Sequence, residues 1–227
     1  MEAAATIALV IAVVIVVAIL GARSARLRRE LMQRVAASIS GTFHKEDPFG
    51  LAARHEKAFP TLRTGSRRYA YNVVHGEDDG RPIWIFDHHY ETYSHDKNGR
   101  KTHHHHRTFV LIETDVEFPP MEARPEGFFD KIKAAFGYND IDFESAEFSR
   151  SWHIGSPDRE FAYAVFHPTM IEFFQTLGGM RMSTAGAYAL FRIGSGRMDE
   201  SEIRTTMRHA SGFMERLPRY LRKDHAR

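Results

Sequence analysis

The longest apolar run of the chain lies at its N-terminus. Residues 3–20 (AAATIALVIAVVIVVAIL) carry no charged side chain. With the next two residues they form, as an α-helix, a segment about 30 Å long, which matches the hydrocarbon core of a bilayer. A cleaved signal peptide has a positive N-terminal region and a shorter apolar stretch, whereas only Met1 and Glu2 precede this run. The pattern therefore predicts an uncleaved, single-pass signal-anchor over residues 1–22.

The charges beside this run predict its orientation. Four arginines follow the run closely and none precedes it: Arg23, Arg26, Arg28 and Arg29. Basic residues next to a span are retained on the cytoplasmic side of the membrane. We therefore expect these four side chains to flank the membrane, with the N-terminus outside and the C-terminal domain in the cytoplasm.

A periodic segment and a turn-rich segment follow the anchor. Apolar residues recur every four positions in the first of them: Leu27, Leu31, Val35 and Ile39. This spacing predicts a basic juxtamembrane helix over residues 23–40, whose arginines face lipid phosphates. Residues 41–66 contain DPFG, FPTL and TGS and are interpreted as a linker with at most one short helix. One folded domain is expected over residues 67–227.

The expected domain begins with strands. Aromatic and β-branched residues dominate three runs, at residues 67–74, 81–93 and 101–114, and turn-forming residues separate these runs. Such a pattern predicts an antiparallel meander. Asn98 and Gly99 both tolerate a positive φ, which favours a two-residue type I′ turn between the second and third strands.

This turn implies a register for the hairpin. If Asn98 and Gly99 are its central residues, Lys97 pairs with Arg100. Three further pairs then share one face of the hairpin: Tyr93 with His104, Glu91 with His106, and His89 with Thr108.

The second half of the chain alternates helix and strand. The patterns predict a helix over 124–137, a strand over 147–154, two helices separated at His167-Pro168, a hairpin over 180–194 and a long helix over 199–222. The whole is an α+β domain of antiparallel strands packed with amphipathic helices. A meander followed by a long C-terminal helix is also the element order of a pleckstrin-homology-like barrel, an analogy that rests on order alone.

Composition removes several classes of function. Thirty-one Lys and Arg residues balance twenty-nine Asp and Glu residues, so no nucleic-acid partner is expected. The chain has no cysteine, which excludes disulfides, cysteine zinc sites and thiol nucleophiles. It has no G-x-S-x-G, Walker, dinucleotide or H-E-x-x-H motif. A non-catalytic binding or scaffolding domain at the membrane is therefore favoured, with the bilayer and a protein partner at the membrane as expected partners.

The run THHHHRTF at residues 102–109 is the one candidate for chemistry. Side chains alternate faces along a strand, so His104 and His106 share a face, where Glu91 and His89 can join them. Two imidazoles and a carboxylate are acceptable ligands for zinc or another divalent metal, although the spacing matches no recognised motif. We favour a solvated hairpin end. The alternative is a metal-dependent enzyme or sensor that uses Glu91, His104 and His106.

A longer block carries a resemblance. Residues 124–174 (RPEGFFDKIKAAFGYNDIDFESAEFSRSWHIGSPDREFAYAVFHPTMIEFF) resemble the signature block of an uncharacterised bacterial membrane-anchored family, a domain of unknown function, through the elements DIDFES.EF and FAY...HP.M. A weaker similarity extends through residues 91–110 and the N-terminal span. The resemblance implies a bacterial cell-membrane protein with one soluble domain, and it supplies no catalytic residues.

Overall fold

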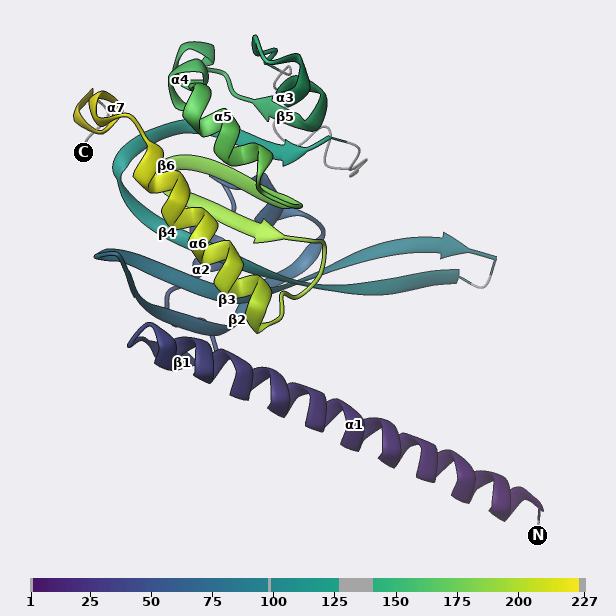
Figure 1. Ribbon diagram of the computed structural model, residues 1–227. Coiled ribbons are helices and arrows are strands. Elements are labelled where there is room, and N and C mark those ends of the chain that lie inside the picture. Colours follow the sequence, from purple (N-terminus) through teal and green to yellow (C-terminus); the bar gives the residue numbers. More distant parts are fainter. Residues whose placement is uncertain (1, 98, 127–140, 225–227) are drawn as a thin grey trace.

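The computed structural model describes residues 2–97, 99–126 and 141–224 of the chain. Within these ranges, one long N-terminal helix is followed by an α+β unit, in which helices pack on a six-stranded antiparallel sheet (Figure 1). This confirms the predicted fold class. The helix predicted over 124–137 falls almost entirely outside the described residues.

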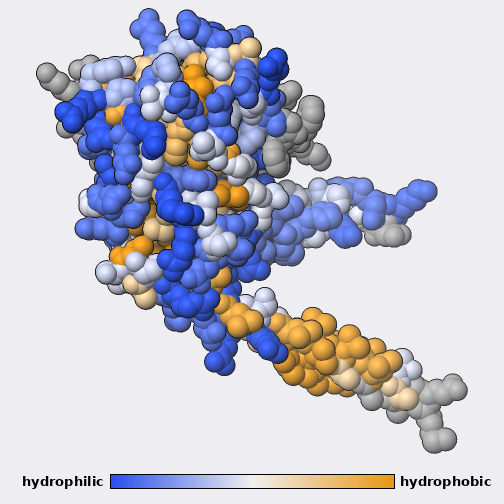
Figure 2. Space-filling view, in the orientation of Figure 1, coloured by the Kyte–Doolittle hydropathy of each residue, from blue (hydrophilic) through white to orange (hydrophobic). Residues whose placement is uncertain are grey.

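Helix α1 (Glu2–Ser38) contains both the predicted anchor and the predicted juxtamembrane helix without a break. It is long and apolar enough to cross a membrane, and its N-terminal apolar side chains are exposed. Figures 1 and 2 show this apolar half extending away from the rest of the molecule. Near its other end, Met32, Val35 and Ala36 are buried in the main hydrophobic core. The anchor is therefore continuous with an element of the folded unit.

Residues 41–66, interpreted from the sequence as a linker, fold against the sheet. They form strand β1 (Thr42–His44), helix α2 (Leu51–His55) and the 3-10 helix η1 (Pro60–Arg63). Strand β1 pairs with β2, and a second apolar cluster buries Leu51, Phe59 and Leu62. Side chains on both sides of Arg67 thus belong to the same packed unit.

The first strands of the sheet pair in chain order, as the meander predicts. Strands β2 (Ser66–Asp78), β3 (Arg81–Asp96), β4 (Gly99–Pro125) and β5 (Trp152–Gly155) follow β1, and β6 (Met180–Ile193) also pairs with β4. Strand β4 is unusually long because successive parts of it pair with β3, β6 and β5. Among the residues that the structure describes, no other strand lies beside the outer part of the β3–β4 hairpin, which projects from the sheet in Figure 1.

Five more helices lie in the described part of the chain: α3 (Ala146–Ser151), α4 (Arg159–Val165), α5 (Pro168–Gln175), α6 (Glu200–Arg216) and α7 (Arg219–Asp224). The break at His167-Pro168 is confirmed. Helix α6 begins at a capping box between Asp199 and Glu202, and its buried face includes Ile203, Ala210 and Phe213.

Three predicted elements differ from the structure. Residues 147–154 begin as helix rather than strand because the Ser145 side chain accepts a bond from the Phe148 N–H and caps α3. The hairpin predicted over 180–194 is instead one continuous strand, β6 (Met180–Ile193), within which Gly186 takes a left-handed conformation (φ 57°) without forming a hairpin turn. The C-terminal helix stops at Leu217, because the residue before Pro218 avoids the helical region.

Candidate functional site: a buried arginine and a histidine cluster

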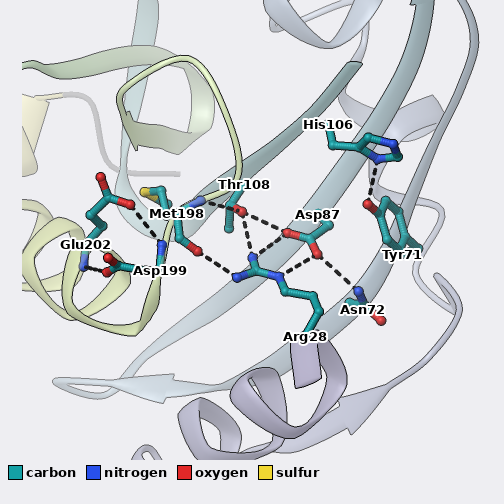
Figure 3. Close-up of polar contacts among 9 residues, drawn as sticks. All are labelled: Arg28, Tyr71, Asn72, Asp87, His106, Thr108, Met198, Asp199 and Glu202. Carbon is teal, nitrogen blue, oxygen red and sulfur yellow. Dashed lines mark hydrogen bonds and ion pairs between the residues drawn. The ribbon is translucent and has the colours of Figure 1, made fainter. Parts of the chain in front are cut away.

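Arg28 of α1 forms a bidentate ion pair with Asp87 of β3 inside the protein (Figure 3). Its Nε donates to Oδ2 at 2.9 Å and its Nη2 donates to Oδ1 at 2.6 Å. The Asp87 side chain is fully buried and that of Arg28 is 9% exposed. Burying two charges is unfavourable unless their remaining donors and acceptors are also satisfied.

Neighbouring groups provide those bonds. Nη1 of Arg28 donates to the Met198 carbonyl at 2.6 Å, and Nη2 also donates to the Thr108 hydroxyl at 2.8 Å. That hydroxyl donates to Asp87 Oδ1, while the Asn72 amide donates to Oδ2. Asn72 reaches the carboxylate from an irregular position in β2, where the register with β3 shifts and its φ is 48°. The pair therefore joins α1, β2, β3, β4 and the segment just before α6.

Arg28 thus departs from the predicted membrane-flanking set. It lies in the core, whereas Arg23 and Arg26 are exposed and Arg29 is partly exposed. Arg26 pairs with Glu30 on the surface of α1 at 2.8 Å. A run of arginines after an apolar span gives no sign that one of them turns inward. The available signal was Asp87, a carboxylate on the same alternating face as Ile83 and Ile85, which are both buried.

The β3–β4 hairpin has a register two residues away from the predicted one. Asp96 pairs with Gly99, so Glu91 lies opposite His104 and His89 lies opposite His106. Gly99, rather than the residue after it, closes the turn on the β4 side, with a φ of 109°. Because the shift is an even number of residues, each histidine keeps its predicted face.

The register brings together two of the three predicted metal ligands and replaces the third. Glu91 Oε1 lies 3.5 Å from His104 Nδ1, and His89 Nε2 lies 3.2 Å from the same nitrogen. One potential ligand atom from each of these residues lies within 4.8 Å of the others. His106 instead points Nδ1 at the Tyr71 hydroxyl, 2.8 Å away. Burial and nearby Arg197 lower the pKa of His106, so it favours the neutral form.

Fixed contacts hold two members of this cluster. His89 is buried, stacks on Tyr69 and has Nδ1 3.1 Å from the Arg67 carbonyl. The buried carboxylate of Glu91 accepts a bond from the Tyr93 hydroxyl at 2.9 Å. His104, in contrast, keeps 59% of its side chain exposed. The cluster is thus fixed from inside and open to solvent at one corner.

The opposite face of the hairpin is an aromatic and cationic stack. Tyr90 stacks with both His88 and His105, and the Arg107 guanidinium lies over its ring at 4.9 Å. Burial and the Arg107 charge lower the pKa of His88 to about 4, and neither of its ring nitrogens has a hydrogen-bond partner among the described residues. His88 is therefore neutral at pH 7 and packs as an aromatic ring.

Comparison with known proteins bears on the fold. No family model matches the chain, and a search of curated proteins finds no match. Among solved structures, the chain is similar to the crystal structure of the mycobacterial trehalose monomycolate transport factor A, TtfA, with a TM-score of 0.57 and 16% identity. The similarity covers 84% of this chain and 96% of that one. At this identity it shows a shared fold, and the likeness spans almost all of the TtfA chain in that structure.

Proposed function

We propose that this protein is a non-catalytic accessory factor of a bacterial membrane, whose anchor holds an α+β binding domain rigidly at the cytoplasmic face. The observation that carries the proposal is the path of α1, which runs without a break from the apolar span to the ion pair between Arg28 and Asp87. The similarity in fold to TtfA, a trehalose monomycolate transport factor, is compatible with an accessory role in the transport of a glycolipid.

The anchor leaves the domain little freedom. Arg28 lies six positions after Ala22, which is about 9 Å along the helix at 1.5 Å per residue. A protein that needs only to be retained at the membrane is served by a flexible linker, which lets the domain diffuse around its attachment point. Here the helix that leaves the bilayer is itself packed in the core. This arrangement suits a domain that must present one surface at a fixed height and orientation.

The projecting β3–β4 hairpin indicates which way that surface faces. Figures 1 and 2 show its polar arm extending from the domain toward the same side as the apolar half of α1. Exposed basic residues lie near its tip, namely Lys97, Arg100 and Lys101. A basic arm beside a membrane anchor is attracted to anionic headgroups. We therefore assign the bilayer surface, and a membrane protein embedded in it, as the partners of this face.

An insertion experiment tests the proposal. Four Gly and Ser residues inserted after Ser24 interrupt α1 between the span and Arg28 while leaving every residue of the chain in place. The control is a matched insertion of four Gly and Ser residues after Gly80, in the exposed turn between β2 and β3. In a strain that lacks its own copy of the gene, the control should restore the export of radiolabelled glycolipid and the α1 insertion should not. Full export with the α1 insertion, at equal membrane abundance, would reject the proposed rigid presentation.

A further inference from the structure

We propose that His89, Glu91 and His104 form a binding site for a single divalent transition metal ion of the zinc class. The proposal concerns the base of the β3–β4 hairpin and does not depend on the accessory role argued above. Two imidazole nitrogens and one carboxylate oxygen are a ligand set that zinc accepts, with a fourth position left to water or another ligand.

The spacing of the ligand atoms fits a zinc tetrahedron. With bonds of about 2.05 Å and tetrahedral angles, two ligand atoms of one zinc ion lie about 3.3 Å apart. His89 Nε2 and His104 Nδ1 are separated by 3.2 Å, and His104 Nδ1 and Glu91 Oε1 by 3.5 Å. The third edge lies within the 4.8 Å that encloses the set. An ion can therefore enter with small side-chain rotations and no movement of the strands.

The tautomer of His89 is the one that a metal requires. Its Nδ1 lies 3.1 Å from the carbonyl oxygen of Arg67, and a carbonyl only accepts hydrogen bonds. Nδ1 therefore carries the proton of the neutral ring, and Nε2 presents its lone pair toward His104. A metal-binding histidine commonly donates its second N–H to a backbone carbonyl in this way. The irregular β2 register between Ser66 and Tyr69 places that carbonyl, since Arg67 has a φ of 48°.

The carboxylate of Glu91 is also held in a position to bind the metal ion. The Tyr93 hydroxyl bonds Oε2 of Glu91, so the other oxygen, Oε1, is the one that faces His104. Arg67 lies 3.6 Å from Oε1, but its side chain is 76% exposed and can turn toward solvent when a cation replaces it. His104 is the exposed corner through which the ion enters. Because Glu91 and His104 are directly paired across β3 and β4, a bound ion would also stiffen the base of the projecting hairpin.

The test uses the full chain in detergent micelles, purified with a tag that contains no histidine. Zn²⁺ is titrated by calorimetry, and Co²⁺ is added as a spectroscopic substitute whose visible absorbance reports four-coordinate geometry. The variants are Glu91→Gln and His104→Gln, and the controls are His106→Gln on the same face and His105→Gln on the opposite face. His104 is exposed, so its replacement does not endanger folding.

We expect one Zn²⁺ per chain in the parent protein and a tetrahedral Co²⁺ spectrum. Glu91→Gln and His104→Gln should each bind Zn²⁺ at least about 10-fold more weakly than the parent protein. Loss of an outer-shell partner of a metal site already costs about 10- to 100-fold in affinity, and these two variants lose a ligand itself. The two control variants should bind Zn²⁺ with the affinity of the parent protein, because neither His105 nor His106 is a ligand in the proposed site. Several weak ions per chain, an octahedral Co²⁺ spectrum, or equal losses in all four variants would overturn the proposal, because each would show adventitious binding to the histidine run.

Discussion

Arg28 of the anchor helix and Asp87 of the central sheet are 59 residues apart and form a buried, bidentate ion pair. The pair also connects several elements of the fold, because Asn72, Thr108 and Met198 each form a hydrogen bond with Arg28 or Asp87. Through it, the C-terminal half of α1 is connected to three strands and to the segment just before α6.

Removing Arg28 should strongly destabilise the domain. In Arg28→Met the apolar stem is kept, but Asp87 loses both bonds from the guanidinium and remains as a buried carboxylate. Breaking such a pair costs about 3–5 kcal/mol. The control is Arg26→Met, which removes a surface pair with Glu30 worth at most about 1 kcal/mol. Urea unfolding in micelles, followed by tryptophan fluorescence, measures both. Equal stability of the two variants would contradict the structural role of the pair.

The orientation of the anchor can be measured directly. Arg23, Arg26 and Arg29 still follow the span with Arg28 buried, so we expect the C-terminus in the cytoplasm. An alkaline phosphatase fused after residue 227 should be inactive, and a green fluorescent protein at the same position should fluoresce. Active phosphatase at that position would place the domain outside and refute the orientation.

His55 should make the stability of the domain depend on pH. It is buried against the Tyr188 ring, and burial, reinforced by the Arg54 charge and opposed by Glu113, lowers its pKa to about 4. The unfolded chain binds the proton from about pH 6.5 downward, whereas the folded protein resists protonation until about pH 4. Stability from this residue is therefore complete above pH 6.5 and is lost as the pH falls toward 4, by up to about 3 kcal/mol.

The replacement His55→Phe keeps the ring contact with Tyr188 and removes the titration. Its unfolding free energy should fall less between pH 6.5 and 4 than that of the parent protein. His95→Gln, at an exposed position of the hairpin, should leave the pH dependence unchanged. Chemical unfolding at four pH values measures this dependence. If the unfolding free energy of His55→Phe changed with pH as much as that of the parent protein, the buried His55 ring would not be the cause of the pH dependence.

The basic tip of the hairpin should approach anionic lipid. A fluorophore on His95→Cys, in full-length protein in nanodiscs, should transfer energy to headgroup dyes more efficiently in anionic than in zwitterionic lipid. Replacing Lys97, Arg100 and Lys101 with Glu should abolish the difference, as each basic residue near such a surface contributes about 1 kcal/mol. High salt should have the same effect. Identical transfer in the two lipids would show that the arm does not contact the bilayer surface.

The parts of the fold that follow from local pattern were predictable. The apolar span, the meander and the break before Pro168 each depend on signals within a few residues. The contacts of Arg28 were not predictable, because its partner lies far away in sequence and the other arginines near it in α1 are exposed or partly exposed. The register of the hairpin was wrong by two residues, since a Gly that ends a turn and a Gly inside a turn look the same in the sequence. This difference in register changes the candidate metal site, because His89, and not His106, lies beside Glu91 and His104 in the structure.

The block that carries the family resemblance has a structural role wherever it is described. Ile141, Phe148, Phe161, Phe166 and Phe174 are buried in the main core. Asp158 caps α4 by accepting a bond from the Phe161 N–H. The block thus supports the fold of the domain, and the family assignment itself stays a prediction.

The most direct test of the rigid anchor is a distance distribution between α1 and the domain. The chain has no cysteine, so Ser24→Cys and Arg208→Cys, both at exposed positions, place one spin label on α1 and one on α6 without further changes. In nanodiscs, double electron–electron resonance should give a single narrow distance peak for the parent pair of labels, and the peak should broaden when Asp87→Ala removes the partner of Arg28. A broad distribution in the parent protein would show that the domain moves independently of its anchor and would contradict this account.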